Sequence, residues 1–287
     1  MAEIKPNYDT KRKKLAEIIP LASPFTVYIE QTKYCNFKCF YCIHSTRDEA
    51  DGEFRALGHR MQHMDEAFFE KIIRELKEFP QDGIKRIVFS GLGEPLMNPR
   101  LPEYVRMAVD AQIAGRVEVI TNGLLLTPEK SRALVEAGIT NINISVQGLD
   151  ASGYEETCGI RIDFARYLEN LKYLYEHRGK VQIYIKAIDA TLGTKENEEK
   201  FFEIFSPFAD RIYIEHLVVM QQQMDGLREI VDGTKNFYGE ELDVNRKVCA
   251  QSFYFMQIGC EGDIFPCPVP GLGKNLSMGN AKEHTLT

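Results

Sequence analysis

The alternation of short apolar strands with amphipathic helices constrains the fold of this chain most strongly. Helical spacing of apolar residues is clear, for example, in the segment 66–79, which follows Asp65 as a predicted cap. Near-continuously apolar strands that alternate with helices are typical of a parallel sheet covered by helices. We therefore expect an α/β fold whose sheet curls into a full or partial barrel, with the active site where the strands end. Six strands are predicted, at residues 26–31, 84–90, 117–121, 141–146, 181–188 and 212–217.

Three cysteines follow the first predicted strand within eight residues. Cys35, Cys39 and Cys42 are spaced Cys-x3-Cys-x2-Cys, so that one loop can wrap three thiolates around one metal centre. Three ligands around a four-iron cluster leave one iron without a protein ligand, and an open metal position is typical of a site with a chemical task. The alternatives are a zinc knuckle and cysteines that only pack in the core.

Polar side chains also gather where the other strands end. Each of these groups is weak evidence alone, since Asn122-Gly123 also suits a simple turn and Lys186 a surface position. Together they indicate one polar rim at the carboxyl ends of the strands. They are Gly91-Leu92-Gly93-Glu94-Pro95, Thr121-Asn122-Gly123, Ser145-Val146-Gln147, Lys186 with Asp189, and Glu215-His216.

Charge and cysteine content exclude several classes of protein. The net charge of −7 offers no electrostatic basis for general nucleic-acid binding. No apolar run approaches the roughly 18 residues of a membrane span, and the first residues lack the apolar core of a signal peptide. The odd count of 7 cysteines fits a reducing compartment, so we expect a cytoplasmic protein without a membrane partner.

The chain divides into three predicted parts. Residues 1–24 form a leader segment, 25–217 the barrel, and 218–287 a connector followed by a hairpin that turns at Glu261-Gly262-Asp263. Cys249, Cys260 and Cys267 belong to this last part. Cys158 is expected in the loop before the helix that follows the fourth strand, as a small packed side chain.

With these motifs, residues 25–217 resemble the radical S-adenosylmethionine (SAM) enzymes. The spacing of Cys35, Cys39 and Cys42, with Tyr41 before the last cysteine, is that superfamily's defining motif, and Gly91-x-Gly93-Glu94-Pro95 looks like its second signature. The resemblance implies a partial (β/α)6 TIM-like barrel with a 4Fe-4S cluster on the three cysteines. SAM would bind the open iron and be cleaved to methionine and a 5′-deoxyadenosyl radical.

The resemblance also implies roles for single residues. The Tyr41 backbone would lie by the adenine, and the Gly91 to Glu94 motif by the amino group of the methionine moiety. Glu94 could instead be a general acid, or an edge carboxylate without a role. Asn122, Ser145 and Gln147 are expected on the cofactor side. Thr121, Lys186, Glu215 and His216 would line the substrate side, unless Lys186 only forms an ion pair with Glu215 or Asp189.

The C-terminal cysteines resemble the opening of a SPASM or twitch extension. The pattern Cys249-x12-Gly262-x4-Cys267 implies an auxiliary iron–sulfur cluster with Cys249 and Cys267 as ligands. Cys260 would be a third ligand, a free thiol that returns a hydrogen atom to a substrate radical, or an inert side chain. The later cysteine-rich part of such an extension is absent before Thr287, so the extension is expected to be incomplete.

The resemblance predicts a radical SAM oxidoreductase or epimerase. The short N-terminus suggests no peptide-leader recognition domain, which favours a sugar, aminocyclitol or similar small-molecule substrate, oxidised by dehydrogenation or epimerised. An external one-electron reductant of the flavodoxin or ferredoxin type is expected. The alternatives are a maturase that modifies a ribosomal peptide, and a non-catalytic iron–sulfur or zinc protein.

Overall fold

The structure is a computed structural model that describes residues 2–7, 14–80, 83–219, 227, 231–243, 245 and 247–286. Part of the predicted connector, residues 220–226, 228–230, 244 and 246, lies outside the described residues. The strands are β1 (Glu3–Ile4), β2 (Thr26–Ile29), β3 (Arg86–Phe89), β4 (Arg116–Thr121), β5 (Asn141–Ser145), β6 (Gln182–Ile188), β7 (Arg211–Glu215), β8 (Phe255–Ile258), β9 (Asp263–Phe265) and β10 (Gly279–Asn280). The α-helices are α1 (Glu53–Ala56), α2 (Glu66–Leu76), α3 (Leu101–Asp110), α4 (Pro128–Glu136), α5 (Ala151–Cys158), α6 (Phe164–His177), α7 (Asp189–Leu192), α8 (Lys195–Phe205) and α9 (Gln251–Tyr254). The 3-10 helices are η1 (Leu15–Glu17), η2 (Ile43–Thr46), η3 (Pro95–Met97), η4 (Ser206–Phe208) and η6 (Lys274–Leu276).

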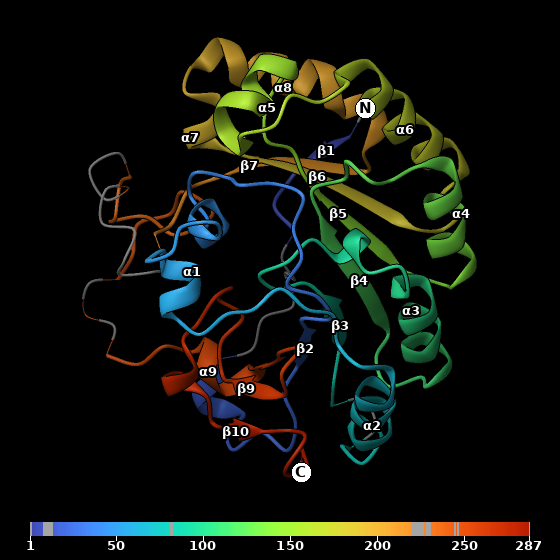
Figure 1. Ribbon diagram of the computed structural model, residues 1–287, viewed down its shortest axis with the longest axis vertical. Helices are drawn as coiled ribbons and strands as arrows, with labels where there is room; N and C mark the ends of the chain where they lie inside the picture. The colour runs from blue at the N-terminus through green and yellow to red at the C-terminus, as the bar shows by residue number, and fades with distance from the viewer. Residues whose placement is uncertain are drawn as a thin grey trace.

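The strands form one curved sheet in the order β1-β7-β6-β5-β4-β3-β2-β8-β9-β10 (Figure 1). Every neighbouring pair from β1 to β8 is parallel, and β9 and β10 are added antiparallel. Because the order is linear among the described residues, the sheet is an open, partial barrel. The predicted α/β fold is confirmed, with all six predicted strands present as β2 to β7.

The apolar core lies between the sheet and its outer helices. Helices α3, α4, α6 and α8 line the convex side of the sheet, and α1 lies on the other side (Figure 1). Ile142 and Ile144 of β5 are fully buried and belong to one apolar cluster with Leu134 of α4 and Leu171 of α6. The predicted cap is present, since the Asp65 side chain accepts a hydrogen bond from the Phe68 N–H at the start of α2.

The inner face of the sheet is polar, so the prediction of near-continuously apolar strands is wrong for that face. Successive side chains of a strand point to opposite faces, and the inner positions hold Arg86, Glu118, Asn143 and Lys186. The Glu118 carboxylate is 1% exposed and lies 2.9 Å from Arg116 and 3.3 Å from Arg86. The charges are tolerated because they are paired within the barrel.

Both ends of the described chain extend this sheet. β1 from the predicted leader pairs with β7, and β8 from the predicted extension pairs with β2. The segment 43–63 contains η2 and α1. One local prediction is wrong, because Cys158 is the last residue of α5 rather than a loop residue. No helix in the described part of the chain is both long enough and apolar enough to cross a membrane.

Candidate functional site

The loop with Cys35, Cys39 and Cys42 leaves the end of β2 and is held by the end of a helix. All three thiols are free and half-buried. The N–H of Lys38 donates to the Cys158 carbonyl and that of Phe40 to the Thr157 carbonyl, each at 3.0 Å. Carbonyls in the last turn of a helix have no partner within the helix, so the end of α5 offers the acceptors that the loop backbone needs.

The Gly91–Pro95 loop after β3 packs directly on the cysteine loop. The Glu94 N–H donates to the Tyr34 carbonyl at 2.8 Å. A Cβ on Gly93 would lie 2.3 Å from the Thr32 carbonyl oxygen, and one on Gly91 would lie 2.5 Å from the Glu30 side chain. These approaches are closer than any side chain allows, so both positions require glycine for packing.

Glu94 joins the loop after β3 to the end of β4. Its carboxylate is 3% exposed and accepts hydrogen bonds from the Thr121 hydroxyl at 2.5 Å, the Asn122 N–H at 2.7 Å and the Leu96 N–H at 3.0 Å. Burial raises the pKa of Glu94, and the hydrogen bonds from Asn122, Thr121 and Leu96 oppose that rise. Glu94 is therefore not an unbound carboxylate at the sheet edge.

Two further contacts connect the cysteine loop to the ends of β4 and β5. The Asn122 side chain donates a hydrogen bond of 2.7 Å to the Oδ1 of Asn36, the residue that directly follows Cys35. The Tyr41 hydroxyl donates to the Gln147 Oε1, and the Gln147 Nε2 donates to the Ser145 carbonyl at 3.2 Å. All predicted cofactor-side residues thus lie around one loop.

Burial is the main cause that raises the pKa of two of the three loop thiols. It raises the pKa of Cys35 to about 12 and that of Cys42 to about 12, so neither is ionised near neutral pH without a cation. The Asn36 Nδ2 beside Cys35 is buried and has no hydrogen-bond partner. Thiols that require a cation and an amide that requires an acceptor fit a bound metal cluster with an anionic ligand.

Three of the predicted substrate-side residues, Lys186, Glu215 and His216, form two pairs where β6 and β7 end, whereas Thr121 donates to Glu94 on the cofactor side. Lys186 Nζ lies 2.5 Å from Glu215 Oε2, and the Tyr184 hydroxyl donates to the same carboxylate at 3.2 Å. His216 Nδ1 lies 2.6 Å from Asp189 Oδ2. Burial lowers the pKa of His216, but its hydrogen bonds with Asp232 and Asp189 outweigh burial and leave that pKa raised. The Lys186–Glu215 ion pair, one of the two considered, is present.

The structure does not bring the three C-terminal cysteines together. Cys249 is exposed and Cys267 half-buried; burial raises the pKa of Cys267, and the nearby Cys249 raises it further. Cys260 is 2% exposed, and its thiol donates to the Glu30 carbonyl at 3.0 Å, on the side of β2. Cys249 and Cys267 are thus neighbours, while Cys260 lies apart.

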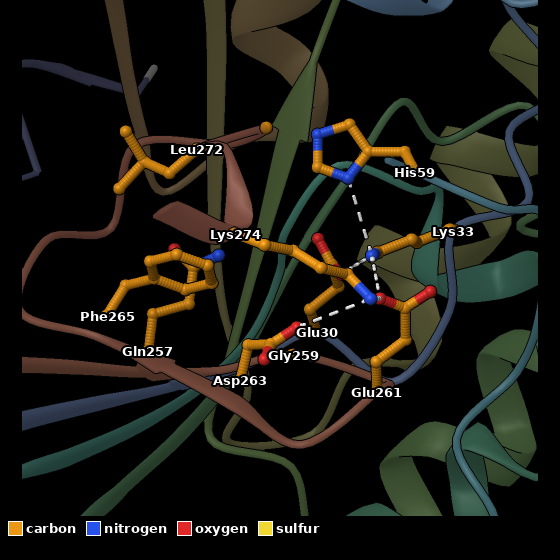
Figure 2. A pocket seen from close by; sticks show the side chains of 11 residues that line it. Glu30, Lys33, His59, Gln257, Gly259, Glu261, Asp263, Phe265, Leu272 and Lys274 are labelled. Carbon is orange, nitrogen blue, oxygen red and sulfur yellow. Dashed lines mark hydrogen bonds and ion pairs between the residues drawn. The ribbon is translucent and has the colours of Figure 1, made fainter. Parts of the chain in front are cut away.

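The structure contains a charged pocket beside Cys260 that the sequence did not predict (Figure 2). Lys33 is buried there, 3.7 Å from Glu30, 3.6 Å from Glu261 and 3.4 Å from His59 Nδ1. Burial, and next the Lys33 charge, lower the pKa of His59 to about 4. The sequence offers only a weak signal for this pocket, because its residues come from the segment after β2, from the segment after α1 and from the hairpin.

The described residues contain no three His, Cys, Asp or Glu side chains arranged to hold a single metal ion. A four-iron cluster sets a different requirement, because each thiolate binds its own iron.

The chain belongs to the Radical SAM superfamily, whose family model matches residues 29–206. Members of this family bind a 4Fe-4S cluster and SAM and use an external reductant. The resemblance inferred from Cys35 to Cys42 and from Gly91 to Pro95 is confirmed.

Relatives of several activities share this region. The chain is 30% identical over 179 residues to the tungsten-containing aldehyde ferredoxin oxidoreductase cofactor-modifying protein of Pyrococcus furiosus, which covers 62% of this chain and 46% of that protein. It is 35% identical over 133 residues to a probable GTP 3',8-cyclase of Methanococcus maripaludis, which covers 46% of this chain and 40% of that protein. The chain thus spans less than half the length of these relatives.

Solved structures share the fold. Streptococcus suis SuiB bound to S-adenosylmethionine matches with a TM-score of 0.64 at 20% identity, over 95% of this chain and 66% of that chain. BtrN in complex with AdoMet and 2-DOIA matches with a TM-score of 0.53 at 20% identity, over 91% and 80%. At this level of identity the similarity shows the fold alone.

Proposed function

We propose that this chain is a radical SAM enzyme that abstracts a hydrogen atom from a carbon of a small polyol such as a sugar or aminocyclitol. Cys35, Cys39 and Cys42 would hold the cluster. When bound, the cluster supplies the electron that cleaves SAM into methionine and a 5′-deoxyadenosyl radical. The observation that carries this proposal is the contact of one three-thiol loop with the ends of β3, β4 and β5 through Glu94, Asn122 and Gln147.

The residues around that loop would bind and orient the cofactor. Tyr41, Gly91, Gly93, Glu94, Asn122, Ser145 and Gln147 are proposed to line the cofactor side. The buried Glu94 would hold the Thr121–Asn122 segment in place, which keeps the Asn122 amide directed at Asn36. The unpaired Asn36 Nδ2 is the donor that this arrangement leaves free for an anionic group.

The substrate side is proposed at the ends of β6 and β7. Lys186, Glu215 and His216, with Tyr184, offer charged and hydroxyl groups that suit a substrate rich in hydroxyl or amino groups. The outcome would be dehydrogenation or epimerisation. A peptide substrate is the second possibility, because one SuiB structure was solved bound to precursor peptide SuiA, with a TM-score of 0.63 at 19% identity over 95% of this chain and 66% of that chain.

The three-part division remains part of the proposal: 1–24 as a leader, 25–217 as the radical SAM barrel, and 218–287 as a connector with a SPASM or twitch-like extension. Cys249 and Cys267 would carry an auxiliary cluster. Cys260, whose thiol donates to Glu30, suits a third ligand or a hydrogen donor only if the hairpin moves. The free thiols favour a reducing cytoplasm with a flavodoxin or ferredoxin type reductant.

Anaerobic reconstitution with iron and sulfide, followed by SAM and dithionite, tests the core of the proposal. We expect 5′-deoxyadenosine from the wild-type chain and none from Cys42→Ala. A wild-type chain that binds iron but forms no 5′-deoxyadenosine would show a non-catalytic iron–sulfur protein instead.

The substrate class is tested with deuterated candidate polyols and peptides. Deuterium should move from a polyol carbon into 5′-deoxyadenosine. Transfer from a peptide and from no polyol would contradict the proposed substrate class.

A further inference from the structure

Cys158 lies against the central cysteine of the metal-binding loop. It is the last residue of α5, is 1% exposed, and its Sγ lies 3.7 Å from Cys39 Sγ, within hydrogen-bond distance for sulfur. The same residue accepts the Lys38 N–H through its carbonyl at 3.0 Å. Backbone and side chain of Cys158 therefore both contact the loop, which fixes the distance between the two sulfurs.

In the structure the Cys39 thiol donates to the Cys158 Sγ, and this direction reverses when Cys39 binds iron. A cysteine that ligates a metal does so as a thiolate and has no proton to donate. Cys158 would then be the only one of the two with an S–H group. The Tyr41 hydroxyl also lies beside Cys39; it donates to the Gln147 Oε1 and is a second candidate donor to the Cys39 sulfur.

We propose that the Cys158 thiol donates a hydrogen bond to the Cys39 sulfur of the cluster and raises the cluster's reduction potential. The inference rests on the proposed function, because Cys39 must be a ligand. Hydrogen bonds to cluster sulfurs tune the potential. The reduced cluster carries more negative charge on its sulfurs, so a donor stabilises the reduced form more than the oxidised one. Cys158 would thus be a positioning and tuning residue, not a ligand.

The contact can be deleted without changing a ligand, because Cys158 reaches Cys39 through its side chain.

The experiment compares the full-length wild type with Cys158→Ala, Cys158→Val and Cys158→Ser after anaerobic reconstitution. Iron and sulfide content is measured first, and the midpoint potential is then measured by a redox titration followed by electron paramagnetic resonance. We expect equal iron content and a midpoint shifted to more negative potential in the Ala and Val variants. Ser keeps a donor, so its midpoint should stay closer to that of the wild type.

The outcomes separate this inference from the proposed function. Equal midpoints in the wild type and in Cys158→Ala, at equal iron content, would overturn the hydrogen bond alone. Cys158→Val covers the case in which Ala fails to fold. A wild-type chain that assembles no cluster, or full cluster content in Cys39→Ala, would instead overturn the proposed function.

Discussion

The loop Cys35–Cys42 and the C-terminal segment 249–267 carry three cysteines each and are built in different ways. The loop is bound to the end of α5 and to the loops that follow β3, β4 and β5, so its three thiols are held around one place. In the C-terminal segment Cys249 is exposed, while Cys260 is buried against β2. Spacing in sequence brings thiols together only where the surrounding backbone is held by other elements.

The largest difference between the two regions should appear in SAM cleavage. Ala at Cys35, Cys39 or Cys42 should reduce 5′-deoxyadenosine formation to the background, because each removes a ligand of the proposed catalytic cluster. Cys249→Ala should keep SAM cleavage and lose only the iron of the auxiliary site. Iron content and product chromatography measure both. Equal loss of cleavage in Cys249→Ala would remove the distinction between the regions.

Backbone packing gives the next comparison. Gly93→Ala would place a Cβ 2.3 Å from a backbone carbonyl, whereas Gly259→Ala in the hairpin meets its nearest atom at 3.5 Å. We expect Gly93→Ala to lower the free energy of unfolding by about 1–3 kcal/mol, and Gly259→Ala to change it by less than about 0.5 kcal/mol. Urea unfolding measures both. An unchanged free energy of unfolding in Gly93→Ala would mean that the Gly91–Pro95 loop can move away from the cysteine loop without loss of stability.

Acid should lower the free energy of unfolding through His59, which lines the pocket of Figure 2. The pKa of His59 falls from 6.5 to about 4 through burial and the Lys33 charge. Between these values the unfolded chain binds a proton that the folded chain does not, so stability falls as the pH falls. At about pH 5 this loss is roughly 2 kcal/mol relative to neutral pH.

His44 beside the cysteine loop contributes with the same sign, because burial lowers its pKa to about 3. His59→Gln should therefore remove about half of the loss that the two histidines cause together. Urea unfolding of both proteins at about pH 7.5 and about pH 5 measures it. Unchanged pH dependence in the variant would show that His59 is protonated in the folded chain.

Single polar contacts should give the smallest effects. Tyr41→Phe removes the hydrogen bond to Gln147 and should cost about 1 kcal/mol of unfolding free energy. Lys274→Met breaks the pair with Glu261, but Lys274 is 52% exposed, so its loss should stay below about 1 kcal/mol. Thermal unfolding of the two variants side by side checks the order. A larger loss of stability in Lys274→Met than in Tyr41→Phe would contradict this order.

The strand–helix order and the motif spacing were readable without a structure. Apolar periodicity placed β2 to β7, because each strand buries its outer face against helices, as Ile142 and Ile144 do. The spacing of Cys35, Cys39 and Cys42 identified the family for the same local reason, since one loop supplies all three thiols. These features depend on residues that are neighbours in the chain.

Contacts between distant residues were decided only by the tertiary structure. Nothing local in the sequence shows that Cys158 meets Cys39, that Lys33 is buried near Glu261, or that Cys260 lies away from Cys249. The curvature of the sheet and the addition of β8 to β2 produce these contacts. The local sequence pattern thus determined the elements and the metal-binding loop. The curvature of the open sheet decided which side chains surround that loop.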